Sequence, residues 1–177
     1  MALAAAVPTG QAQESQVRQY ELPNLDGLEL VVPPGWQDTV DQPPDGGSPT
    51  IQLHPAAGAP FEVLITPVWA QPPDRPAPDA ETLREIVRGA AERLRGQVVE
   101  EDIEIRRLQG LGGVGFYFVA TDRAPEEFKY MNQGELQVGD LTLMFTILTN
   151  DGQDAVVEQA FAMLVSARHR STGMDQR

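Results

Sequence analysis

The stretch Gly110–Asp122, GLGGVGFYFVATD, decides which class of fold this sequence adopts. Its glycines follow the spacing G-x-G-x-x-G, which in dinucleotide-binding folds joins a strand to a helix whose N-terminal amides hold a pyrophosphate. Here Gly115 is followed by aromatic and β-branched residues that alternate with period two, which is typical of a strand. The expected helix is missing, and so is a later strand that ends in an acid. The stretch therefore predicts a glycine-rich turn between antiparallel strands.

Two further strand-like stretches follow this turn and are joined by a tight hairpin. They cover residues 127–138 and 141–149, and Gly139 stands at the first central position of the two-residue connection, as type II′ turns require. In the second stretch, Leu143 and Phe145 belong to an apolar face, whereas Thr142 and Met144 belong to a face that is only half polar. We therefore expect both faces of this strand to be covered.

The rest of the chain predicts four more strands and two amphipathic helices. Asp79–Arg95 has an N-cap aspartate, an apolar stripe with helical spacing and Gly96 at its end. Asp154–Arg168 shows a similar stripe, with basic residues at its C-terminal end. The expected strands lie at residues 28–32, 49–55, 61–69 and 97–108. The sequence thus predicts an α+β protein with about seven mainly antiparallel strands and both helices packed on the sheet.

The composition limits the possible partners and chemistry. The net charge of −13 argues against nucleic acid or an anionic membrane as a partner. The chain has no cysteine, which excludes disulfides, thiolate metal sites and cysteine nucleophiles. No apolar run approaches the roughly 20 residues that a transmembrane helix needs.

The residue types of common active sites do not assemble into a recognisable pattern. Only two histidines are present, His54 and His169, and no G-x-S-x-G motif accompanies them. Acidic residues alternate along the chain at Glu100, Asp102 and Glu104. They could form a cation site, but their spacing favours a charged edge strand that resists aggregation. We therefore predict no catalytic residues, no metal site and no cofactor, and hence no enzyme.

Four large side chains are candidates for packing or partner binding. Trp36 follows a Pro-Pro-Gly turn and is expected in the core. Trp69 precedes a proline-rich loop and is either a core residue or an exposed binding anchor. Met131 and Met144 have flexible side chains that suit an adaptable binding surface.

The two ends of the chain differ from its middle. Residues 1–16 are rich in alanine and then polar, like the second half of a secretory signal peptide with cleavage after Ala12; a disordered tail is the alternative. Residues 17–170 are expected to form a single domain, and residues 171–177 a disordered C-terminal tail. The predicted location is periplasmic or secreted.

The order of these elements resembles the PsbP-like superfamily, including bacterial DcrB-like proteins. The resemblance covers about residues 25–169 and rests on VPPGW near the first strand, on RLQGLGGVGFYF, and on the hairpin FKYMNQGELQVGDLTLMFTILT before a C-terminal helix. It implies an α/β/α sandwich and a non-catalytic accessory or binding role. No functional residues carry over, because the members use different surfaces.

Two functional hypotheses follow. The first is a protein-binding or accessory module of the bacterial cell envelope. The second is a chaperone or carrier that shields an apolar helix or a small apolar ligand on the sheet face around Met131 and Met144. In the first hypothesis the partner is another protein, and Trp69 is a further candidate contact.

Overall fold

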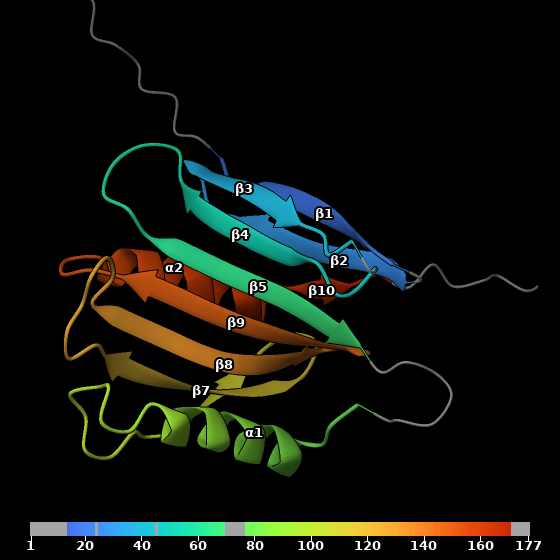
Figure 1. Ribbon diagram of the computed structural model, residues 1–177. Coiled ribbons are helices and arrows are strands. Elements are labelled where there is room, and N and C mark those ends of the chain that lie inside the picture. The colour runs from blue at the N-terminus through green and yellow to red at the C-terminus, as the bar shows by residue number, and fades with distance from the viewer. Residues whose placement is uncertain (1–13, 24, 45, 70–76, 171–177) are drawn as a thin grey trace, which may run out of the picture.

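The computed structural model describes residues 14–23, 25–44, 46–69 and 77–170 (Figure 1). Within these residues the chain forms ten strands and two helices. The strands are β1 (Gln16–Leu22), β2 (Leu25–Val32), β3 (Trp36–Asp41), β4 (Thr50–Pro55), β5 (Glu62–Trp69), β6 (Arg106–Gln109), β7 (Val114–Thr121), β8 (Tyr130–Val138), β9 (Leu141–Thr149) and β10 (Arg168–His169). The helices are α1 (Ala80–Arg93) and α2 (Asp154–Val165).

Seven of these strands form one antiparallel sheet in the order β3-β4-β5-β9-β8-β7-β6. The central pair joins β5 to β9, from Glu62 opposite Leu148 to Trp69 opposite Leu141. A smaller antiparallel sheet has the order β1-β2-β10. The predicted α+β class, with an antiparallel sheet between helices, is confirmed.

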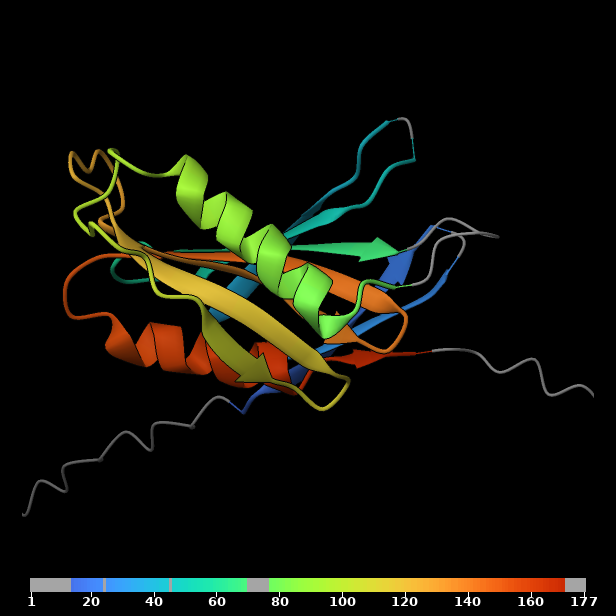
Figure 2. The same cartoon turned by 90° about the horizontal axis from the view of Figure 1, so that it is seen from below.

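The main core lies between the large sheet and a layer made of α2 and the small sheet (Figures 1 and 2). Alternate residues of the central strands point into it, because successive side chains of a strand face opposite sides. Trp36 is 6% exposed and packs its ring 4.6 Å from that of Phe61, which confirms its predicted core position. The fully buried side chains include Leu28, Leu30, Ile51, Leu53, Ile65, Leu136, Leu143 and Ile147.

Helix α1 packs on the opposite face of the large sheet. Its N-cap Asp79 accepts a hydrogen bond of 2.8 Å from the backbone N–H of Thr82, which satisfies one of the amide groups that a helix N-terminus leaves without a partner. Leu83 and Val87 are buried beneath the helix, and Val87 belongs to a second core cluster with Phe118 of β7. The predicted helix is confirmed.

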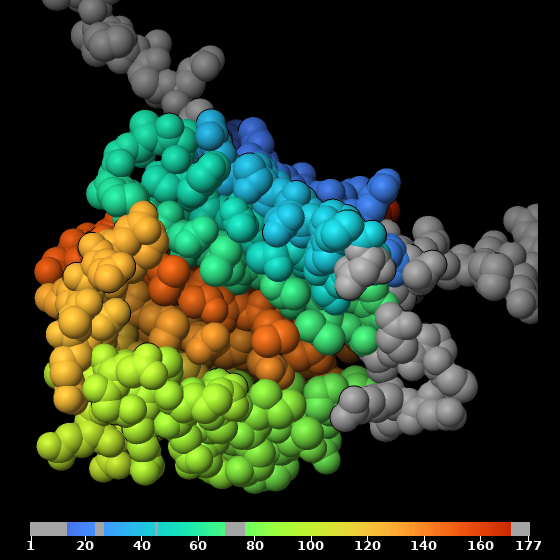
Figure 3. All heavy atoms as spheres, in the orientation of Figure 1, coloured from blue at the N-terminus to red at the C-terminus, as the bar shows by residue number. Residues whose placement is uncertain are grey.

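This second face is only partly covered, contrary to the expectation for β9. Helix α1 contacts β7 and, to a smaller extent, β8, and Figure 2 shows it crossing one side of the sheet. Met144 of β9 consequently keeps 46% of its surface exposed. Figure 3 shows the uncovered strands β8, β9 and β5 between α1 and β4. A single helix about 10 Å wide spans two or three strands spaced 4.8 Å apart, which leaves much of the face open.

Several element boundaries differ from the prediction. Of the strand expected at residues 97–108, only residues 106–108 belong to a strand, β6. Val98 forms an isolated bridge with Asp122, and the Glu100 carboxylate accepts hydrogen bonds from the N–H and hydroxyl of Thr121. Helix α2 ends at Val165, and Arg168 and His169 pair with β2 instead of extending the helix. The sequence reading also missed β1, β3 and β10. Of the N-terminal segment 1–16, predicted as a signal peptide or tail, residues 1–13 lie outside the described residues, as does the tail at 171–177, whereas Gln16 is the first residue of β1.

The glycine-rich turn is a hairpin, as predicted. Gln109 and Val114 close the β6–β7 ladder, and the N–H of Gly110 donates to the carbonyl of Gly113 at 2.9 Å. A Cβ at Gly112 would lie 2.8 Å from the Cα of Val138. A Cβ at Gly115 would lie 2.4 Å from the backbone oxygen of Glu135. These glycines therefore allow close approach between neighbouring backbones.

Replacement of Gly115 by alanine should destabilise the fold, because the atoms that a methyl group would meet belong to the backbone of β8 and cannot move aside cheaply. We expect a loss of at least about 1–3 kcal/mol, as for other overpacked sites. Gly89→Ala in α1 is the matched control: its Cβ meets only Arg93, at 3.8 Å, and the change should add about 0.8–1 kcal/mol through helix propensity. Urea unfolding of both variants measures this, and equal stability of the two would contradict the packing argument.

Candidate binding site

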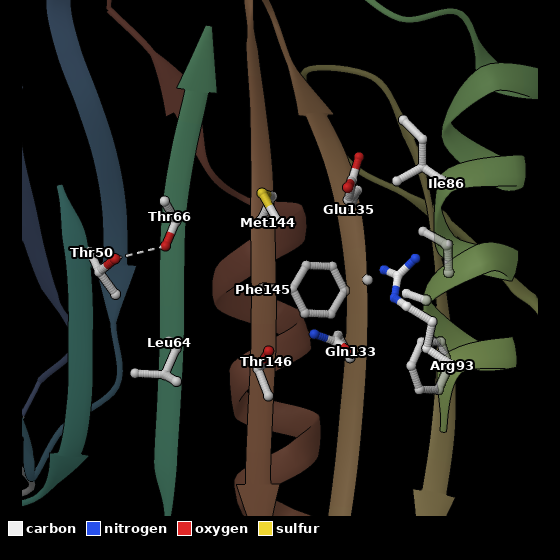
Figure 4. A pocket seen from close by; sticks show the side chains of 14 residues that line it. Thr50, Leu64, Thr66, Ile86, Arg93, Gln133, Glu135, Met144, Phe145 and Thr146 are labelled. Carbon is white, nitrogen blue, oxygen red and sulfur yellow. Dashed lines mark hydrogen bonds between the residues drawn. The ribbon is translucent and has the colours of Figure 1, made fainter. Parts of the chain in front are cut away.

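The incomplete cover creates a groove between α1 and the open face of β4, β5, β8 and β9. We call it the α1 groove; it encloses about 360 Å³. Figure 4 shows its side chains converging from the helix and the strands. It is lined by Thr50, Leu64, Thr66, Ile86, Val87, Ala90, Arg93, Phe118, Gln133, Gly134, Glu135, Met144, Phe145 and Thr146.

One wall of the groove is a flank of α1. Ile86, Ala90 and Arg93 have the spacing i, i+4 and i+7, which places them on one side of the helix. Ile86 is 43% exposed although it is a large apolar residue. Ala90 projects only a methyl group between the two longer side chains. The helix thus has two contact faces: one is buried on the sheet and the other faces the groove.

The floor is formed by the outward-facing residues of the central strands. Leu64, Thr66, Met144 and Thr146 alternate with core residues, and the two strands are in register, with Thr66 opposite Met144 and Leu64 opposite Thr146. At the far edge, the hydroxyls of Thr66 and Thr50 are hydrogen-bonded at 2.9 Å (Figure 4). Threonine and methionine make this floor mildly apolar, which suits a surface that is exposed until a partner binds.

Glu135 of β8 gives the groove its one acidic group. The side chain is half-buried, and this burial raises its pKa above the usual value of a glutamate. Within the described part of the chain, its carboxylate has neither a hydrogen bond nor an ion pair. Arg93 on α1 is the other charged side chain of the lining, and Figure 4 shows its guanidinium reaching toward β8.

The three predicted contact residues are not brought together. Met144 lines the α1 groove. Met131 is half-buried and packs against the core cluster beneath α1. Trp69 is half-buried and packs against the main core. The sequence did not indicate Glu135 or Arg93 as site residues. It placed Ile86 and Ala90 in the apolar stripe of the helix that packs on the sheet, which is wrong for Ile86, since this side chain is exposed and lines the groove.

The histidines occupy separate places. His54 lies on β4, with its Nδ1 3.1 Å from the carbonyl of Gln37. His169 lies on β10 with its side chain only 8% exposed and its Nδ1 3.9 Å from Asp140. Its Nε2 is buried without a hydrogen-bond partner. Each histidine therefore belongs to a different sheet, and they share no site.

The predicted acidic edge strand also takes a different form. Burial tends to raise the pKa of Glu100, but hydrogen bonds from the backbone and side chain of Thr121 outweigh this effect and hold the pKa below its usual range. Glu104 pairs with Arg106 at 3.2 Å. Among the residues that the structure describes, no group of three or more side chains could hold a metal ion.

Comparison with solved structures identifies the architecture. The solution structure of cyanobacterial PsbP (CyanoP) from Synechocystis sp. PCC 6803 matches 95% of this chain and 99% of its own, with a TM-score of 0.54 and 13% identity. The chain has a PsbP-like fold. The narrower likeness to DcrB-like proteins stays a prediction. A crystal structure from Bacteroides thetaiotaomicron VPI-5482 matches 93% of this chain and 51% of its own, with a TM-score of 0.47 and 10% identity. No family model matches the chain, and neither does any curated protein sequence.

Replacing Glu135 with glutamine should stabilise the protein near neutral pH. Its raised pKa means that the folded state holds the proton more tightly than the unfolded state, so the carboxylate costs stability above the folded pKa. The gain should be on the order of 0.5 kcal/mol, because the group remains partly solvated, and should disappear as pH falls below the unfolded value of about 4.3. Urea unfolding at pH 7 and pH 4 measures this. Glu158→Gln on the exposed face of α2 is the control, and an equal gain there would refute the burial effect.

Proposed function

We propose that this protein is a non-catalytic binding module of the bacterial cell envelope that holds an amphipathic helix of a partner protein in the α1 groove. The observation that carries the proposal is the exposure of Ile86 on the wall and Met144 on the floor of one groove. Contiguous exposed apolar surface of this kind is typical of a binding site. The PsbP-like fold supports the non-catalytic part, since the superfamily resemblance implies accessory and binding roles.

The dimensions of the open face favour a helix as the occupant. Helices pack side by side at 8–10 Å, and strands are spaced about 4.8 Å apart, so a helix beside α1 would lie over β9 and β5. The residues at that position are Leu64, Thr66, Met144 and Thr146, together with the exposed flank of α1. Ala90 on that flank permits close approach of the second helix. The occupant would thus complete the helical layer on this face.

A small apolar molecule is the second candidate. The enclosed volume of about 360 Å³ lies at the lower end of the range for ligand pockets, about 300–1,000 Å³. The groove nevertheless opens along the exposed face of β5 and β9, and a compact molecule would cover only part of this face (Figure 3). This geometry favours the longer occupant.

The envelope location rests on the signal-like composition of residues 1–16. In the described part of the chain, neither helix is long and apolar enough to span a membrane.

A photo-crosslinking residue at position 144 should capture a polypeptide partner in the native host. Met144 is 46% exposed and lines the groove, so a benzophenone side chain there would face the bound segment. Val99, 55% exposed and outside the groove lining, is the matched control position. Denaturing electrophoresis of irradiated cells should show a larger adduct for position 144 only. Adducts at both positions, or at neither, would contradict the proposed groove.

Export should remove the N-terminal segment. Mass spectrometry of the protein expressed from its full gene in the native host should find a mature chain that begins between about residues 13 and 16, in an envelope or secreted fraction. An intact N-terminus in the cytosolic fraction would overturn the proposed location, while the groove could still be tested by crosslinking.

A further inference from the structure

The folded structure gives no reason for a charged side chain at the position of Glu135. It lies in β8, opposite Met144 of β9 on one side and Phe116 of β7 on the other. The other residues of the lining are apolar or neutral, apart from Arg93. A half-buried carboxylate without a protein partner pays for desolvation and recovers nothing from the fold. A group that costs stability and faces a binding groove is typical of a functional residue.

We propose that Glu135 makes the α1 groove selective for a helix that carries one basic side chain within its apolar face. The inference rests on the proposed function and names the chemistry of its ligand. A lysine or arginine that reached Glu135 would donate charge-assisted hydrogen bonds to the carboxylate. In the free protein the carboxylate has already lost part of its hydration. The additional desolvation that binding requires is therefore smaller, and the ion pair compensates for it. A helix without a cation would bury the carboxylate and leave it unpaired.

Arg93 limits where in the groove the cation of the ligand lies. It projects from α1, whereas Glu135 projects from β8, so the groove presents charges of opposite sign from two walls (Figure 4). No described ion pair joins them. A cation on the ligand is attracted to Glu135 and repelled by Arg93, so it is favoured on the side of Glu135 that faces Met144. The charged groups that line the groove from α1 and β8 are these two, and β4, β5 and β9 contribute none.

Binding of the basic helix should depend on pH in a defined direction. Burial raises the pKa of Glu135 in the unliganded protein, and a bound cation would lower it again, so binding releases any proton that the carboxylate holds. Affinity for the basic helix should therefore rise with pH through the range in which Glu135 ionises and level off above it. A neutral helix should lack this rise.

The test uses three synthetic amphipathic helices of about 18 residues that differ only in the central residue of the apolar face: lysine, leucine or glutamate. Fluorescence anisotropy gives the Kd of each for the wild type and for Glu135→Gln. We expect the wild type to bind the lysine helix at least about tenfold more tightly than the glutamate helix, the scale of a charge-assisted hydrogen bond. In Glu135→Gln this ratio should fall below about threefold, and Glu135→Lys should reverse it.

Two controls separate this inference from the proposed function. Glu158→Gln changes the net charge equally on α2, so it should keep the wild-type ratio; a comparable fall there would assign the preference to the overall charge of −13 and overturn the role of Glu135. Met144→Asn removes an apolar contact without adding a charge and should weaken every helix. If Met144→Asn does so while Glu135→Gln leaves the ratio unchanged, groove binding stands and the selectivity is wrong. If no helix binds the wild type, both are contradicted.

Discussion

The structure depends on the pairing of β5 with β9. These strands are separated by more than seventy residues, yet their register from Glu62–Leu148 to Trp69–Leu141 unites the β3-β4-β5 half of the sheet with the β6–β9 half. Because side chains alternate along each strand, the same pairing assigns Ile65 and Phe145 to the core and Thr66 and Met144 to the groove floor. A slip by one residue would exchange the two sets, so core and groove are specified together.

The opposite sides of this sheet are covered to different degrees. The core side is closed by α2 and the small sheet, whereas the described residues that cover the other side are α1 and the segment after it, which contributes Val98, Ile103 and Ile105. β5 contains a proline, Pro67, which pairs with Leu143 of β9. The pairing of β4 with β5 ends at Ile65, before Pro67, so the missing N–H of the proline breaks no hydrogen bond to β4. Figure 2 shows the β3–β4 hairpin leaving the plane of the sheet. The groove is open because α1 covers only part of this side of the sheet.

The GLGGVG stretch shows how one spacing serves two physical purposes. In a dinucleotide site the glycines admit a pyrophosphate to the backbone, and here they admit a neighbouring strand and hairpin. Gly112 meets Val138, and Gly115 meets the backbone of Glu135 and Leu136. The common requirement is the absence of a Cβ, so the spacing alone could not distinguish the two cases. The residues after Gly115 distinguish the two cases, because their side chains alternate with period two, as in a strand.

The sequence by itself determined the class of the fold, both helices, the β8–β9 hairpin and the core position of Trp36, since each depends on local periodicity, capping or turn chemistry. It did not reveal β1, β3 or β10, whose polar stretches form strands only because a neighbouring edge offers hydrogen bonds. It drew attention to Met144 but not to its partners. Ile86 and Arg93 lie on α1 and Glu135 lies on β8, and only the tertiary packing of α1 over part of the sheet brings them to one groove. How much of a face one helix covers is a matter of three-dimensional width, which no local pattern encodes.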